Sequence, residues 1–171
     1  TGVQTCALPI FTIKDRKPVL VAGGIGVPPM LELAKGIHAI YPDMKITAVL
    51  GYRDSNTFLV DDIKKYADVI IATDDGSLGV HGNVIDAIKQ NKVEAQIFYA
   101  CGPTPMLRGL KAYAQENDIE AQLSLEEKMA CGIGACLACV CQSKEKDHHS
   151  NVNNKRICKD GPVFLAEEVE L

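Results

Sequence analysis

Four cysteines in the C-terminal part of the chain are spaced like the ligands of a small metal cluster. Cys131, Cys136 and Cys139 form the pattern C-x4-C-x2-C. A fourth cysteine, Cys158, follows after a polar segment. This is the ligand spacing of a plant-type two-iron, two-sulfur cluster, whose last thiolate comes from a distant part of the chain. Because such a cluster moves single electrons, we expect the chain to be part of an electron-transfer path.

A zinc site is the alternative for the same thiolates. Zinc sites usually combine two short chelating turns, whereas here three cysteines come from one loop, which favours the iron–sulfur cluster. Gly132 and Gly134 allow this loop to wrap tightly, so that backbone N–H groups point at the sulfurs and raise the reduction potential. Cys141 follows Cys139 by two residues, and we expect it to be a small buried residue rather than a ligand.

Two turns that contain glycine have the composition of a nucleotide-binding edge. The first, Gly23–Met30, has the sequence GGIGVPPM, and the second, Cys101–Met106, has the sequence CGPTPM. Glycine lets a phosphate approach the backbone, and the start of a helix adds N–H groups and a favourable dipole. Taken alone, the first turn favours a phosphate site, and a simple chain reversal is the alternative. Cys101, taken alone, is equally compatible with a buried thiol at the end of a strand.

Short β-rich runs alternate with longer amphipathic runs between residues 17 and 125. The run 18–23 is continuously apolar and ends in glycines, which is typical of a buried parallel strand. The predicted strands are 18–23, 45–52, 68–73, 96–100 and 120–125, and the predicted helices are 28–40, 60–66, 82–90 and 103–116. This alternation predicts an α/β fold with a doubly wound, parallel, five-stranded sheet. Its ligand is expected at the carboxyl ends of the strands.

Composition and charge exclude several classes of function. The formal net charge of −4 and the lack of a basic cluster argue against nucleic acid as a partner. No apolar run approaches the ~20 residues that a membrane span requires, and no signal peptide is recognisable. The chain has seven cysteines, of which four fit a cofactor pattern. A reducing cytoplasm is therefore expected rather than a disulfide framework.

The chain divides into three segments. Residues 1–16 are expected to be an artefact or linker, because the first ten read like a translated sequencing adapter. Residues 17–125 form the predicted doubly wound domain. The strand–helix alternation stops after Leu125, so we expect residues 126–171 to form a small cluster-binding module with a few short strands.

The turn Gly23–Met30, the turn Cys101–Met106 and the cysteine motif follow one another along the chain. In this order they resemble the ferredoxin–NADP reductase superfamily. The segments 127–141 and 157–164 are similar, more narrowly, to the electron-transfer subunit of class 1B dihydroorotate dehydrogenase. The resemblance implies NADH or NAD⁺ on the doubly wound domain and FAD between that domain and an N-terminal β-barrel. It implies a [2Fe-2S] cluster near the flavin, facing an FMN-containing dihydroorotate dehydrogenase catalytic subunit in a heterotetramer. Electrons would run from dihydroorotate to FMN, the cluster, FAD and NAD⁺, in pyrimidine biosynthesis.

The resemblance also implies roles for individual residues. Cys131, Cys136, Cys139 and Cys158 would be the cluster ligands. The residues expected near the dinucleotide phosphates are Gly24, Gly26 and Val27. Those expected near the nicotinamide are Cys101, Gly102 and Pro103. Arg53 would pair with the 2′-phosphate of NADP or form a surface ion pair, so the choice between NAD and NADP stays open.

The sequence departs from the family in one respect, and two alternatives remain. No motif of the flavin-binding barrel is recognisable in residues 1–16, so we expect the barrel to be missing and the chain alone to be inactive.

One alternative is the reductase subunit of a hydrogenase or of an NADH-dependent ferredoxin:NADP oxidoreductase. The other is a zinc-stabilised nucleotide-binding module without electron-transfer activity.

Overall fold

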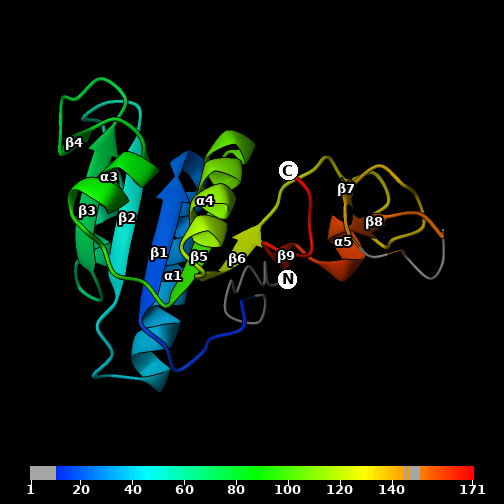
Figure 1. The fold of residues 1–171 in the computed structure, drawn as a ribbon, viewed down its shortest axis with the longest axis horizontal. Helices are drawn as coiled ribbons and strands as arrows, with labels where there is room; N and C mark the ends of the chain where they lie inside the picture. The colour runs from blue at the N-terminus through cyan, green and yellow to red at the C-terminus, as the bar shows by residue number, and fades with distance from the viewer. Residues whose placement is uncertain (1–10, 145, 147–150) are drawn as a thin grey trace, which may run out of the picture.

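A seven-stranded sheet forms the centre of the structure, a computed structural model that describes residues 11–144, 146 and 151–171. Its strand order is β4-β3-β2-β1-β5-β6-β9 (Figure 1). The five central strands are parallel and are β1 (Pro18–Gly23), β2 (Thr47–Tyr52), β3 (Asp68–Thr73), β5 (Ile97–Cys101) and β6 (Glu120–Ser124). The predicted doubly wound sheet is therefore confirmed.

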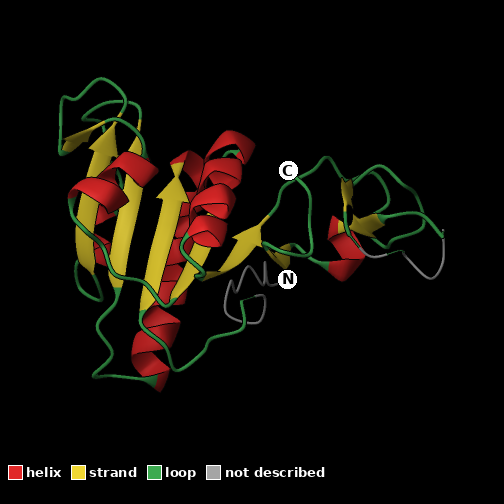
Figure 2. Ribbon diagram, in the orientation of Figure 1, coloured by secondary structure: helices red, strands yellow, loops and turns green. Residues whose placement is uncertain are grey.

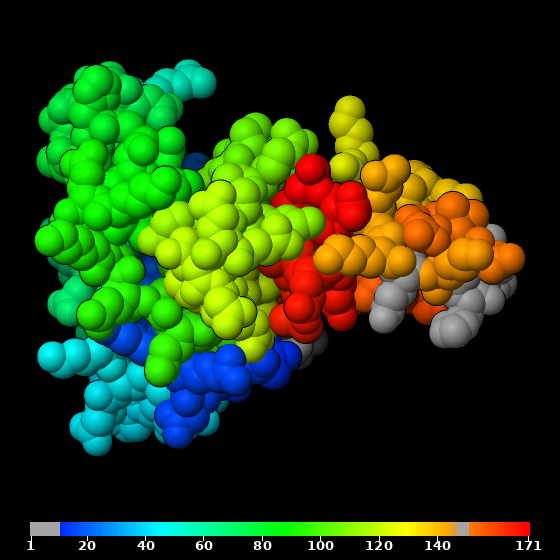
Figure 3. All heavy atoms as spheres, viewed as in Figure 1, coloured from blue at the N-terminus to red at the C-terminus, as the bar shows by residue number. Residues whose placement is uncertain are grey.

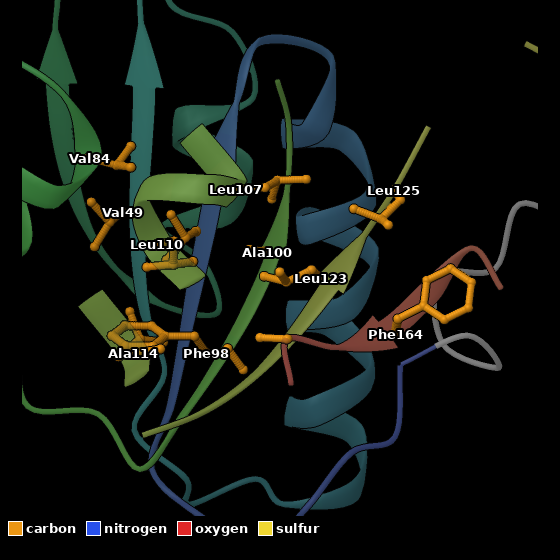
Figure 4. Packing of buried hydrophobic residues seen from close by; sticks show 14 of the residues in the cluster. Val49, Val84, Phe98, Ala100, Leu107, Leu110, Ala114, Leu123, Leu125 and Phe164 are labelled. Carbon is orange, nitrogen blue, oxygen red and sulfur yellow. The ribbon is translucent and has the colours of Figure 1, made fainter. Parts of the chain in front are cut away.

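Helices cover both faces of the sheet, as Figure 2 shows. They are α1 (Val27–Ile40), which follows the 3-10 turn η1 (Gly24–Gly26), α2 (Val60–Ile63), α3 (Val84–Gln90) and α4 (Thr104–Glu116). A hydrophobic core lies on each face of the sheet, and side chains along β1 alternate between the two. Val19 and Val21 belong to the hydrophobic cluster that also contains residues of α3 and α4. Leu20 and Ala22 face the cluster with α1 and α2. Figure 4 shows the first cluster, in which Leu107 and Leu110 of α4 pack over Phe98 and Ala100 of β5.

Two short edge strands extend the sheet beyond the five that the sequence predicts. β4 (Val80–His81) pairs with β3 in parallel, and β9 (Val163–Leu165) pairs with β6 in antiparallel orientation. β9 belongs to the C-terminal segment, and its Phe164 is buried in the same cluster as Leu123 of β6. The C-terminal segment is thereby fixed to the edge of the main sheet.

The remainder of the C-terminal segment projects from that edge (Figure 3). It contains the two-stranded antiparallel sheet of β7 (Val140–Gln142) and β8 (Asn154–Arg156), followed by the single turn α5 (Ile157–Asp160). Its loops carry three of the predicted cluster ligands, and α5 carries the fourth. The core of this part is small, with Cys139, Ile157 and Val169 each at most 1% exposed.

The segment directly before β1 lies against the sheet. Phe11 is 4% exposed, and its ring meets the Tyr99 ring edge to face with centroids 5.6 Å apart. Thr12 exchanges two hydrogen bonds with the side chain of Gln122, at 2.9 and 3.0 Å. Residues 11–16, placed by the sequence in an artefact or linker, thus contribute to the packing of the domain. Residues 1–10 of that segment lie outside the described residues.

None of the helices in the described part of the chain combines the length and apolar character that crossing a bilayer demands.

Candidate functional site

The two glycine turns lie next to each other at the carboxyl edge of the sheet. β1 and β5 are neighbours, and Ala22 is in register with Cys101. A Cβ atom added to Gly26 would lie 1.9 Å from the carbonyl oxygen of Cys101 and 2.9 Å from the backbone N of Gly102. The two turns therefore touch backbone to backbone, and only glycine fits at position 26 without moving them apart.

Gly24 has the opposite environment. Its φ of +53° is in the left-handed region, and a Cβ atom added there would meet nothing within 4 Å. This open space lies over the turn at the start of α1, where no side chain caps the helix. Because Pro28 and Pro29 carry no N–H, the donors available to an anion come from the glycine turn rather than from the first helical turn.

The structure places the predicted nucleotide contacts at different depths. Val27 is fully buried, and its N–H donates to the carbonyl oxygen of Gly24. Gly24 is exposed, Gly102 is half-buried and Pro103 is exposed. Of the predicted contacts, Gly24 from one turn and Gly102 and Pro103 from the other are therefore accessible at this edge, next to the exposed Ile25.

The thiol of Cys101 is buried beneath that surface. Cys101 is 2% exposed, and its partner in the register with β6 is Ser124. Burial raises the pKa of the Cys101 thiol above its usual value, and the hydrogen bond to Ser124 only partly opposes this shift. The thiol is therefore neutral at physiological pH, and the side chain contributes packing at the end of β5.

The C-x4-C-x2-C loop surrounds Cys131 with backbone donors. The N–H of Cys136 lies 3.3 Å from the Cys131 sulfur. This donor, with the N–H groups of Ile133 and Ala135, lowers the pKa of the Cys131 thiol to about 6. The loop can curl this way because Gly132 and Gly134 adopt left-handed φ angles of +68° and +79°. The loop thus stabilises a thiolate, the form that binds metal.

The four predicted cysteines come together. The side chain of Cys131 interacts with that of Cys136. Cys158 interacts most strongly with Cys139, which is the main reason why the pKa of the Cys158 thiol is raised, and it also interacts with Cys131. Among the described residues, no group of three or more histidine, cysteine, aspartate or glutamate side chains lies close enough to hold one metal ion. The strongest interactions join Cys131 to Cys136 and Cys139 to Cys158, which we treat as two pairs.

Buried backbone contacts hold the second pair in place. The N–H of Ile157 donates to the carbonyl oxygen of Cys139 at 2.9 Å, so α5 is fixed beside the loop that carries Cys139. Ile157 and Cys139 are each 1% exposed. The role of Ile157 was not predicted from the sequence, where its only signal is that it precedes Cys158.

Cys141 has a separate environment. It lies in β7, and its sulfur is 3.6 Å from the carbonyl oxygen of Lys155 in β8. Burial raises the pKa of its thiol, which keeps it protonated. Its hydrogen bond is therefore made within the β7–β8 pair.

Comparison with known proteins identifies the C-terminal segment first. Residues 126–170 match the family described as the iron-sulfur cluster binding domain of dihydroorotate dehydrogenase B. The rest of the chain extends this match. It is 44% identical to the "Dihydroorotate dehydrogenase B (NAD(+)), electron transfer subunit" of Caldanaerobacter subterraneus over 160 residues, which cover 93% of the chain and 62% of that relative. The chain is similar to the dihydroorotate dehydrogenase B electron transfer subunits over most of its length.

Further relatives agree with this assignment. The subunit of the same name from Fusobacterium nucleatum is 42% identical over 92% of the chain and 59% of its own length. The chain thus spans about three fifths of the curated relatives that it matches. A solved structure of an NADH-dependent reduced ferredoxin-NADP oxidoreductase is 29% identical, with a TM-score of 0.76 over 89% of this chain and 53% of the other. The resemblance found in the sequence is confirmed.

Proposed function

We propose that this chain is the cluster- and nucleotide-binding part of an electron-transfer subunit that works in dihydroorotate oxidation. The observation that carries the proposal is the pairing of four cysteines within a segment homologous to the dihydroorotate dehydrogenase B cluster domain. Electrons would pass between a [2Fe-2S] cluster, FAD and NAD(H). Because the chain spans about three fifths of its relatives, the complete reaction is proposed for the full assembly, and we expect the chain alone to be inactive.

The pairing favours two irons over one zinc. A tetrahedral zinc site with Zn–S bonds of about 2.3 Å needs all four sulfurs within about 4 Å of one another. A two-iron cluster needs two thiolates on each iron, and the two pairs can be further apart. The strongest interactions, Cys131 with Cys136 and Cys158 with Cys139, fit the second arrangement, and the weaker interaction of Cys158 with Cys131 links the two pairs. The N–H donors around Cys131 would stabilise the charge on the bound sulfurs.

The carboxyl edge of the sheet is the proposed site for NAD(H). The exposed backbone of Gly24 would contact the phosphates, since the space above it is open. The Gly102–Pro103 surface, held against Gly26, would face the nicotinamide. FAD supplies the exchange between the hydride of the nicotinamide and the single electrons of the cluster. This chain would bind the [2Fe-2S] cluster at one end of the electron path and NAD(H) at the other.

Partner and compartment follow from the same chemistry. The relatives are named as subunits, which supports a partner, and we propose an FMN-containing dihydroorotate dehydrogenase catalytic subunit in a heterotetramer. Cluster ligands must stay reduced until they bind iron, and all six described cysteines are free thiols. A reducing, cytoplasmic compartment therefore fits the proposal.

One experiment tests the proposed pathway. The purified chain with its cluster is mixed anaerobically with the FMN-containing catalytic subunit, and dihydroorotate is added. Because dihydroorotate gives up two electrons and each cluster takes one, we expect one dihydroorotate to bleach the visible bands of two clusters, at about 400–550 nm. The same mixture without the catalytic subunit should keep its colour.

A second candidate function is favoured by the solved structure of the NADH-dependent oxidoreductase. It predicts that reduced ferredoxin, and not dihydroorotate with its dehydrogenase, bleaches the cluster. Bleaching by ferredoxin alone would therefore replace the proposed pathway with this one.

A further inference from the structure

A buried arginine lies directly behind the cysteine loop. Arg156, the last residue of β8, is 5% exposed. Its guanidinium donates from Nη1 to the carbonyl oxygen of Gly134, at 3.1 Å. Gly134 belongs to the loop between Cys131 and Cys136. The arginine therefore connects the β7–β8 sheet to the loop that supplies the first pair of cysteines.

The accepting peptide lies directly before a donor to a cysteine. The carbonyl of Gly134 belongs to the planar, trans peptide that joins Gly134 to Ala135. The N–H of Cys136, one peptide further along, lies 3.3 Å from the Cys131 sulfur. By holding the carbonyl, Arg156 fixes the part of the loop that directs this N–H toward the sulfur.

The neighbouring peptide serves the second pair. The backbone of Gly134 is also close to Cys158, where it acts to lower the pKa of the thiol. A Cβ atom at Gly134 would lie 2.8 Å from Cδ of Lys159, so the Lys159 stem covers this stretch of the loop. One short segment, fixed by Arg156, thus lies beside one cysteine of each pair, Cys131 and Cys158.

Asp160 balances the charge of Arg156. Its Oδ2 lies 3.4 Å from Nε of Arg156 and accepts the backbone N–H of the same residue at 2.8 Å. The side chain of Asp160 is 30% exposed, compared with 6% for that of Arg156. The cation is therefore the more deeply buried of the two, where its field is least screened by water.

We propose that Arg156 is a positioning residue for the iron–sulfur cluster, and that the Arg156–Asp160 pair sets the cluster's reduction potential. This inference rests on the cluster assignment in the proposed function. Reduction adds one negative charge to a centre held by four thiolates, and hydrogen bonds and nearby charge set the potential at which this happens. The cation of Arg156 and the N–H group it orients favour the reduced form, while the carboxylate of Asp160 opposes it.

Three variants of the full chain separate this role from a purely structural one. Arg156→Gln removes the cation, and Asp160→Asn removes the anion while keeping an oxygen that can accept the Arg156 N–H. Lys155→Gln is the matched control, because it removes a cation from the adjacent residue, whose ammonium pairs with Glu168. Each midpoint potential is measured by redox titration, followed by visible absorption and by the electron paramagnetic resonance signal of the reduced cluster.

The midpoint potentials of the two pair variants, Arg156→Gln and Asp160→Asn, should shift in opposite directions. At the wild-type midpoint, we expect about a tenfold lower ratio of reduced to oxidised cluster in Arg156→Gln, which corresponds to about 59 mV for a one-electron step. Asp160→Asn should raise the ratio, and Lys155→Gln should leave it near the wild-type value. If Arg156→Gln fails to retain iron, Asp160→Asn still tests the direction of the shift.

Two results would overturn the inference. Shifts of the pair variants in the same direction, or no larger than that of Lys155→Gln, would show that the pair does not set the potential. A wild-type chain that binds no iron would overturn the proposed function as well. A wild-type cluster with unshifted variants would overturn this inference alone.

Discussion

Substitution of Gly26 by alanine tests the contact between the two glycine turns. The added Cβ would lie 1.9 Å from the Cys101 carbonyl oxygen, whereas side-chain Cβ atoms essentially never come within 3.0 Å of such an atom, so the turns must separate by about 1 Å. The atoms in the way are backbone and cannot rotate aside. We therefore expect a cost at the upper end of the range for overpacking, about 3 kcal/mol. For a chain of this size, this lowers Tm by about 6–12 °C.

The matched control is Gly24→Ala, which adds the same methyl group two residues earlier. The position is open, so the cost is only the strain of alanine at a left-handed φ, about 1 kcal/mol. The methyl group would instead occupy the space proposed for the phosphates, so NADH binding should weaken while the fold is kept. Thermal unfolding and fluorescence titration with NADH measure the two effects. Equal stability of the two variants would refute the proposed contact between the turns.

Three further predictions concern the cysteines and the segment before β1. Cys158→Ser should bleach the visible cluster spectrum because it removes one thiolate of a pair, and Cys141→Ser should leave it nearly unchanged; the reverse result would mean that the fourth ligand is assigned wrongly. Cys101 should resist alkylation by iodoacetamide at pH 8 in the folded chain and react after unfolding, because burial raises the pKa of its thiol. Mass spectrometry measures the difference in labelling, and rapid labelling of the folded protein would contradict the burial of Cys101. Phe11→Ala should lower the free energy of unfolding by about 3 kcal/mol, since it empties a buried ring site against Tyr99. A change below about 1 kcal/mol in urea denaturation would show that residues 11–16 do not contribute to the domain.

The central fold follows from patterns that are local in the sequence. Four of the five parallel strands are short, mostly apolar runs, and β6 alternates polar and apolar residues. The long helices between them have apolar stripes with a helical period. The edge strands β4 and β9 have only two and three residues, which is too short for a pattern to distinguish them from loop. β9 is a strand because β6 presents an open edge and Phe164 enters the core there. These are tertiary causes, which local reasoning does not include.

The candidate site was predictable to the extent that its chemistry depends on residue type and spacing. Cysteine spacing indicated the cluster, and the glycine turns indicated the nucleotide edge. Arg156 carried no signal, because an arginine after a polar loop resembles a solvated residue until its burial is known. The packing of Phe11 was also missed, since the segment before β1 is too short to show periodicity. Both depend on contacts with residues distant in the sequence.

Metal and sulfide analysis of the anaerobically purified chain tests the central claim most directly. If two pairs of thiolates hold two irons, we expect two irons and two acid-labile sulfides per chain, with a paramagnetic signal that appears on reduction by dithionite. A colourless protein with one tightly bound zinc per chain would contradict the account.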